Sequence, residues 1–230
     1  MTRIIRLVFV GAALCCFANS AAADRYELSL GSSTRYMHSS SVDALSGDDS
    51  AGVFSMAVGF KLDQPRLQSL DVLVDVTYEG GTATGTTFQR MHSETSMHSG
   101  LLGARLRWNV SERGSFYGRG ALALTRVRLD LIDAFADGPQ VGDRGWSGGV
   151  YLGGGIEVLP IRTVREQRER FALGLRLEGG YLATSAVTMR AVPRGQDVMD
   201  GTIRIPTQYA SLGDLDISAV SLRFAIVGRF

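Results

Sequence analysis

The chain has 230 residues, of which 45% are hydrophobic, and its formal net charge at neutral pH is +1. This length suits one domain, and a charge so close to zero gives no electrostatic reason to expect nucleic-acid binding. A strongly basic nucleic-acid-binding protein is therefore excluded, while the fold is left open.

The first 23 residues have the order of regions found in a secretory signal peptide. Two arginines precede an apolar run that starts at Leu7, and small residues follow it. This run is shorter than the roughly 20 residues that a membrane-spanning helix needs. We therefore predict an export signal at 1–23, cleaved after Ala22 or Ala23, and one domain at 24–230. Both cysteines of the chain lie in the signal, so we expect no disulfide and no thiolate metal site in the domain.

Apolar and polar residues alternate with a period of two in eight segments of the remaining chain. Successive side chains of a β-strand point to opposite faces, so this period indicates strands with one apolar face. No segment of comparable length has the periodicity of an amphipathic helix. We predict strands near residues 25–37, 51–62, 69–79, 97–109, 116–130, 146–158, 171–182 and 216–230.

The connections between these segments alternate in length. Short links are expected near 63–68 and 110–115, and a longer, charged link near 159–170 indicates either extended strands or a short helix. Long polar links are expected near 38–50, 80–96, 131–145 and 183–215. A strand, a long loop, a strand and a short turn in repetition indicate an antiparallel up-and-down meander. Eight such strands are enough to close into a small barrel. The link at 183–215 is too long for a minimal connection and is a functional candidate, for contact with sugar phosphates or a protein partner.

The face opposite the apolar one carries glycine, alanine, serine and charges of both signs. An unpaired buried charge is costly, so such a face can be buried only if its charges pair across neighbouring strands. We predict a charge network inside the lumen formed by Asp71, Asp75, Arg105, Arg107, Arg119, Glu157, Arg176, Glu178 and Arg223. The expected neighbours are Asp71 and Asp75 with Arg105 and Arg107, Glu157 with Arg176, and Arg223 with Glu27.

Aromatic residues lie near the ends of the apolar faces. Alternation alone also fits a soluble lipocalin-like barrel, but that barrel needs large apolar residues inside, whereas two aromatic girdles around an apolar band are typical of a membrane barrel. The predicted fold is therefore all-β, an eight-stranded antiparallel up-and-down transmembrane β-barrel. One girdle would contain Tyr26, Phe60, Trp108, Phe116 and Phe171, and the other Tyr36, Phe54, Tyr78, Trp146 and Tyr181.

The signal, the eight alternating strands, the alternating loop lengths and the final stretch FAIVGRF resemble the small outer-membrane β-barrel proteins of Gram-negative bacteria, of the OmpA-transmembrane-domain and OmpX type. The resemblance implies a location in the outer membrane, among outer-membrane lipid and lipopolysaccharide. It also implies that Phe224, Ile226 and Phe230 form an assembly signal, read by the barrel-assembly machinery through strand pairing.

The resemblance implies location and assembly more firmly than activity. The function we expect is that of a structural, receptor or adhesion protein that acts through long extracellular loops, with no cofactor, no metal and no catalysis. Two alternatives remain open: a lipid-modifying hydrolase of the lipid A deacylase type, and a narrow, porin-like pore. An eight-stranded lumen is just filled by side chains, and here arginine and glutamate face inward, which counts against a wide pore.

Two stretches resemble catalytic motifs. Residues 145–149 read GWSGG and fit G-x-S-x-G, but the nucleophile elbow needs a strand-to-helix turn, and Ser147 opens a predicted strand. The glycines here and at 153–155 are expected to relieve crowding in a narrow lumen.

The stretch MHSETSMHSG at 91–100 places serines, histidines and a carboxylate close together in sequence. A serine nucleophile needs a base within hydrogen-bond distance, and a metal site needs further ligands at fixed spacing. Neighbouring positions in sequence do not establish either arrangement, so we predict a polar surface loop. The candidate residues would be His92, Ser93, Glu94, His98 and Ser99.

Overall fold

The computed structural model describes residues 25–37, 50–62, 70–87, 91–133, 140–165, 168–194, 199–200, 203–204 and 210–230. The predicted signal at 1–23 lies outside the described residues, with Cys15 and Cys16. Within the described ranges, no helix has the length and apolar character needed to cross a membrane.

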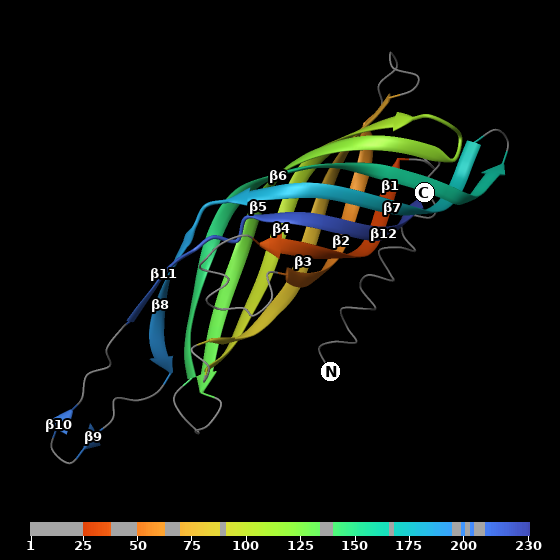
Figure 1. The fold of residues 1–230 in the computed structure, drawn as a ribbon. Coiled ribbons are helices and arrows are strands. Elements are labelled where there is room, and N and C mark those ends of the chain that lie inside the picture. Colours follow the sequence, from red (N-terminus) through yellow and green to blue (C-terminus); the bar gives the residue numbers. More distant parts are fainter. Residues whose placement is uncertain are drawn as a thin grey trace.

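Eight long strands form a closed antiparallel barrel. Each strand pairs with the next along the chain, and the last one pairs with both its predecessor and the first, so the sheet has no open edge at the closure. The predicted all-β, eight-stranded, up-and-down barrel is therefore confirmed (Figure 1). Its strands are β1 (Tyr26–Met37), β2 (Ser50–Leu62), β3 (Leu70–Thr87), β4 (Met91–Asn109), β5 (Gly114–Asp133), β6 (Gln140–Arg165), β7 (Arg168–Thr184) and β12 (Ala219–Arg229).

The barrel is closed by β1 and β12. Their register runs from Glu27 opposite Arg229 to Met37 opposite Ala219. Beyond it, the backbone N–H of Phe230 donates to the carbonyl of Tyr26 at 2.9 Å, and the two aromatic rings of Phe171 and Phe230 lie 5.5 Å apart. We call the end of the barrel at Tyr26 and Phe230 the terminal end, and the opposite end the distal end.

A smaller hairpin adds to the wall at the distal end. The strand β8 (Val187–Arg194) pairs with β6 through Gln140 to Gly142, and β11 (Ala210–Leu215) pairs with β8. Two short strands, β9 (Met199–Asp200) and β10 (Ile203–Arg204), pair with each other. Figure 1 shows β8 and β11 leaving the barrel at its distal end, so the segment predicted as a long loop at 183–215 contains β-structure.

Several strands are longer than predicted. The expected loops at 80–96 and 131–145 are largely strand, because β3 continues to Thr87 before β4 begins at Met91, and β5 continues to Asp133. For the link at 159–170, the first of the two expected alternatives, extended strands, is observed, since β6 continues to Arg165 and β7 begins at Arg168.

The strands were predicted too short at the distal end because the alternation inverts there: outward positions become polar and inward positions become apolar. On β4, Leu102 and Leu106 point outward, but His98 and Glu94 occupy outward positions further toward the distal end, and Met97 between them is buried. A search that follows the outward apolar stripe therefore loses the strand where the stripe ends, although the strand continues.

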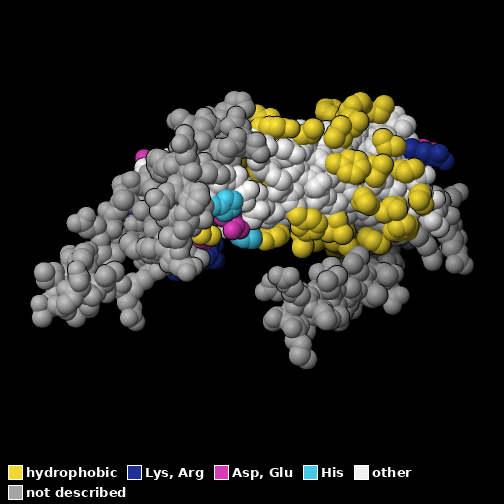
Figure 2. Space-filling model, turned by 60° about the horizontal axis from the view of Figure 1, so that its bottom comes forward, with side chains coloured by type: hydrophobic (Ala, Val, Ile, Leu, Met, Phe, Trp, Pro, Cys, Tyr) yellow, Lys and Arg dark blue, Asp and Glu magenta, His cyan; other side chains and the backbone are white. Residues whose placement is uncertain are grey.

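The outer wall of the barrel carries a continuous apolar belt. Residues at its middle are highly exposed, such as Leu122 at 67% and Leu152 at 65%. Figure 2 shows hydrophobic side chains spread over the wall, with histidine and acidic side chains at its distal margin. The predicted girdle residues point outward, among them Trp108 at 59% and Trp146 at 62% exposure, while Tyr26 and Phe171 are half-buried. Apolar surface of this kind is unfavourable in water and stable against lipid.

Candidate functional site

The lumen contains a dense network of buried charges. Seven arginines and five carboxylates among the described residues are buried inside the barrel. They come from every long strand except β2, because inward positions alternate with outward ones along each strand. The arginines are Arg35, Arg105, Arg107, Arg119, Arg176, Arg223 and Arg229, and the carboxylates are Glu27, Asp75, Glu79, Glu157 and Glu178.

Glu27 is the centre of the terminal half of this network. Its carboxylate accepts hydrogen bonds from Arg105 and Arg176, and one from Arg107 at 3.1 Å. A fourth arginine, Arg229, lies 3.6 Å away. The carboxylate of β1 thus links β4, β7 and β12 across the lumen, which holds opposite sides of the barrel together.

Glu157 and Asp71 extend the terminal half of the network. Glu157 accepts a hydrogen bond of 3.0 Å from Nε of Arg176 and is also paired with Arg229. Asp71, nearer the rim, accepts a hydrogen bond of 2.7 Å from Arg107 and lies 3.0 Å from the ammonium of Lys61. The pairs predicted for Asp71 with Arg107 and for Glu157 with Arg176 are therefore present.

The middle of the lumen continues the same chain of ion pairs. Asp75 contacts Arg105 at 3.3 Å and Arg119 at 2.5 Å. Glu178 then contacts Arg119 at 3.5 Å and Arg223 at 2.9 Å. Through Glu79, which pairs with both Arg223 and Arg35, the chain continues toward the distal end. All nine residues predicted for the lumen network take part in it.

The prediction that Arg223 lies beside Glu27 is wrong. In the register that closes the barrel, Arg223 is opposite Ser33, six residues further along β1, while Arg229 is opposite Glu27. Arg223 therefore meets Glu178 and Glu79 instead. Adjacent strands were identified correctly, but pairing of individual residues also requires the register.

Two buried tyrosines complete the network, and sequence reasoning missed both. The hydroxyls of Tyr117 and Tyr151 each donate to Glu178 at 2.8 Å. The guanidinium of Arg105 lies 5.2 Å from the ring centre of Tyr117, and that of Arg119 lies 5.4 Å from the ring centre of Tyr151. Because the buried arginines outnumber the buried carboxylates, these aromatic faces provide further stabilisation for positive charge in the lumen.

Glycines give these tyrosine rings their space. A Cβ atom on Gly180 would lie 2.2 Å from the hydroxyl oxygen of Tyr151, and one on Gly153, directly opposite on β6, would lie 2.6 Å from it. A Cβ atom on Gly155 would lie 2.8 Å from the hydroxyl oxygen of Tyr117. The expectation that glycines relieve crowding in the lumen is met at Gly153 and Gly155, and Gly180, which was not predicted, has the same role.

We expect Gly180→Ala to destabilise the barrel by about 1–3 kcal/mol, the usual cost of overpacking a filled interior. The added methyl group would displace the buried ring of Tyr151 and its hydrogen bond to Glu178. Gly179→Ala is the matched control, since a Cβ atom there meets no atom within 4 Å. Urea midpoints of the refolded variants measure the difference. Equal midpoints for the two alanine variants would show that the ring is not confined as described.

The distal part of the lumen is apolar, which was not predicted. A cluster of buried residues fills it, and four of its members come from β8, β11 and the segment that follows β11. The hairpin thus continues the wall and contributes side chains to the distal lumen, and the charge network lies on the terminal side of this cluster. The sequence does indicate this apolar part, because inward positions become apolar where outward positions become polar. The cluster consists of Met37, Ala51, Ala83, Met97, Val127, Val187, Met189, Leu215, Ile217 and Ala219.

The stretch 91–100 is part of β4 and does not form the predicted surface loop. Because side chains alternate, His92, Glu94 and His98 are exposed on the outer face, whereas Ser93 and Ser99 are buried on the inner face. Nδ1 of His98 is 2.7 Å from the hydroxyl of Tyr78. The sheet therefore separates the serines from the histidines, and they do not form a nucleophile–base pair.

Ser147 also lies in a continuous strand, within β6, and is buried. Its hydroxyl donates to the backbone carbonyl of Ser185 at 2.5 Å. An extended strand lacks the turn of a nucleophile elbow, so residues 145–149 match the motif in sequence but not in structure. In the described part of the chain, no group of three or more His, Cys, Asp or Glu side chains is placed to hold a metal ion.

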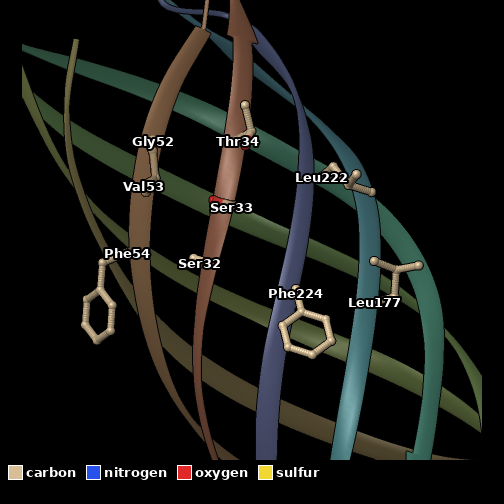
Figure 3. Close-up of a pocket in the computed structure, with 9 residues that line it drawn as sticks. All are labelled: Ser32, Ser33, Thr34, Gly52, Val53, Phe54, Leu177, Leu222 and Phe224. Atoms are coloured by element: carbon tan, nitrogen blue, oxygen red, sulfur yellow. The ribbon is translucent and has the colours of Figure 1, made fainter.

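A groove of about 540 Å³ lies on the outer wall over β1. Ser32 and Thr34 lie on β1 between Phe54 of β2 and Phe224 of β12, and the two aromatic side chains point away from the barrel (Figure 3). Four residues along the groove belong to the apolar belt, namely Phe54, Leu177, Leu222 and Phe224, whereas Ser32, Thr34 and Gly52 are small or polar. The groove is thus a depression in the outer wall and not an entrance to the lumen.

No family model matches the chain, and no curated protein is significantly similar to it in sequence. Solved structures with a similar course of the chain include the attachment invasion locus protein Ail of Yersinia pestis, with a TM-score of 0.46 and 10% identity over 90% of this chain and 98% of that one. The transport unit of the autotransporter AIDA-I from Escherichia coli has a TM-score of 0.38 and 8% identity, covering 92% and 91% of the two chains. The translocator domain of NalP from Neisseria meningitidis has a TM-score of 0.36 and 10% identity, over 100% of this chain and 96% of that one. The barrel assignment rests on the strand pairing of this chain itself.

Proposed function

We propose that the protein is an outer-membrane β-barrel of a Gram-negative cell envelope, with a structural, receptor or adhesion role exerted at its distal end. The observation that carries this proposal is the inverted distribution of polarity: the outer wall is an apolar belt, and the interior holds the ion-pair network. A water-soluble barrel would expose the charges and bury the apolar residues. In a membrane, a closed barrel also satisfies every backbone hydrogen bond of the spanning strands.

The distal end is the part that would face the cell exterior. Strands β3 to β6 continue there beyond the apolar belt, and their outward side chains become polar or charged. The terminal end has the short turn at 110–113 between β4 and β5. Short periplasmic turns and larger extracellular structures are the usual arrangement in such barrels. The predicted export signal and the predicted assembly signal at Phe224, Ile226 and Phe230 agree with this orientation and remain part of the proposal.

The lumen supports a role at the surface more than a role in transport. The charge network crosses the barrel from Asp71 to Arg35, and the apolar cluster fills the distal part of the lumen. Moving a solute through this interior would require several buried ion pairs to be broken, each at a cost of several kcal/mol by the general behaviour of buried pairs. We therefore place the activity on the distal surface, where the protein would meet partners outside the cell.

Cysteine labelling of intact cells tests the location and the orientation together. Because the domain at 24–230 has no cysteine of its own, single variants can be labelled without background. We expect Thr84→Cys, exposed on distal β3, to react with a membrane-impermeant maleimide on intact cells. Glu112→Cys, in the terminal turn, should react only after the outer membrane is permeabilised. The reverse pattern would contradict the orientation, and equal labelling of both variants only after lysis would contradict the location.

A further inference from the structure

Three exposed arginines lie together on the outer face of β5 and β6, immediately beyond the apolar belt. Arg126 and Arg128 take the outward positions that follow Leu124 on β5. Arg144, on β6, is directly opposite Arg128 in the strand register. Side chains directly opposite each other in an antiparallel sheet have their Cβ atoms about 4.5–5.5 Å apart, so these guanidinium groups reach a common space.

The carboxylates beside these three arginines are too few to balance their positive charge. Asp130 pairs with Nε of Arg128 at 2.6 Å, and Glu94, opposite Asp130 on β4, lies on the same face of the sheet. Among the residues that the structure describes, no carboxylate lies within ion-pair distance of the side chain of Arg126 or Arg144. Like charges placed directly opposite each other destabilise a sheet, so the arrangement favours an anion held between them.

The position of the arginines indicates the source of that anion. Trp146 is directly opposite Arg126 and is 62% exposed at the edge of the belt, as expected of a tryptophan at a membrane interface. Below it, Leu124 and Val150 are exposed within the belt. A lipid whose acyl chains lie against these residues would have its headgroup at the level of the arginines. A free anion would gain nothing from this apolar neighbourhood.

We propose that Arg126, Arg128 and Arg144 bind the phosphate groups of a lipid headgroup in the outer leaflet. Arginine suits this role because its planar guanidinium donates two parallel hydrogen bonds to one phosphate. His98, opposite Arg126 on β4, borders the site, and its Nδ1 is already engaged by Tyr78. This proposal rests on the membrane location proposed above. It adds a binding partner, a phosphorylated lipid, at the distal margin of the apolar belt.

Native mass spectrometry of the full-length folded protein, given an equimolar mixture of diphosphorylated and dephosphorylated lipid A, tests the proposal. We expect the wild-type protein to retain the diphosphorylated form preferentially. Arg126→Gln/Arg144→Gln should weaken that binding by about tenfold, the order expected when charged hydrogen bonds are lost. The matched control is Arg25→Gln/Arg113→Gln, which removes two exposed arginines at the terminal end and should leave lipid binding unchanged.

Two results would overturn the proposal: equal binding of the diphosphorylated form by the wild type and the distal double variant, or complete displacement of the lipid by millimolar inorganic phosphate. The second result would show that the arginines take a free anion and not a lipid. The proposed location can fail separately. If cysteine labelling placed the distal end inside the cell while the phosphate preference persisted, the orientation and the assignment to the outer leaflet would be wrong, and the binding of lipid phosphate by the three arginines would stand.

Discussion

Replacing Arg176 by leucine is expected to lower the free energy of unfolding by about 3–5 kcal/mol, the usual cost of removing one member of a buried ion pair. Arg176 is only 3% exposed and is paired with two carboxylates. Its Nε and terminal nitrogen donate to Glu157 at 3.0 and 2.6 Å, and the terminal nitrogen also donates to Glu27. The variant leaves both carboxylates buried with one arginine fewer around them, and this loss of pairing causes the destabilisation.

Equilibrium unfolding in urea, after refolding into lipid vesicles, measures this loss. Arg176→Lys is expected to fall between the wild type and Arg176→Leu, because an ammonium keeps the charge but cannot span both carboxylates as the guanidinium does. Arg113→Leu is the control, since Arg113 is exposed in the terminal turn. If Arg176→Leu and Arg113→Leu unfolded at the same urea concentration, the inward assignment of the charged face would be wrong.

Val76→Arg is expected to destabilise the folded barrel in lipid by about 2–4 kcal/mol, the cost of arginine at the middle of the lipid-facing surface of a barrel. Val76 is 59% exposed and stands in an outward row with Leu102, Leu122 and Val150 on the next three strands. An arginine there would have to leave the hydrocarbon or bring water into it, and both are unfavourable.

Thr84→Arg provides the comparison for Val76→Arg. Thr84 lies on the same strand and the same outward face, eight residues further toward the distal end, beyond the belt. The two variants carry the same added charge and differ only in their level on the wall. We expect Thr84→Arg to refold into vesicles with the yield and stability of the wild type. Equal behaviour of Val76→Arg and Thr84→Arg would mean that the belt does not face lipid.

The course of the barrel could be predicted because alternation is a local signal. Each strand shows its own apolar face, and neighbouring strands in an up-and-down barrel are neighbours in sequence. Pairing of Asp71 with Arg107 needed only that adjacency. The partner of Arg223 depended on the register between the first and last strands, which no local pattern specifies.

Other features were missed because they involve strands that are not direct neighbours. The hydroxyl of Tyr117, on β5, reaches Glu178 of β7 past Gly155, the residue of β6 that lies between them in the strand register, so the contact depends on the register of two strand pairs. The distal ends of β4 and β6 were missed for a different reason. Outward positions there become polar or charged, as at Glu94 on β4 and Arg144 on β6, so the outward apolar stripe ends before the strand does. A change of surroundings along one strand, from lipid to water, explains that change.

Quenching of tryptophan fluorescence by brominated lipids tests most directly whether the outer wall faces a bilayer. The chain has two tryptophans, Trp108 and Trp146, and both are exposed on the outer wall, at 59% and 62%. Trp108 belongs to the predicted girdle nearer the terminal end and Trp146 to the distal one. We expect both to be quenched in the refolded wild-type protein, and more strongly by bromine near the headgroups than by bromine near the ends of the acyl chains. Fluorescence unaffected by bromine at any depth would contradict the inside-out arrangement of apolar and charged residues on which the account depends.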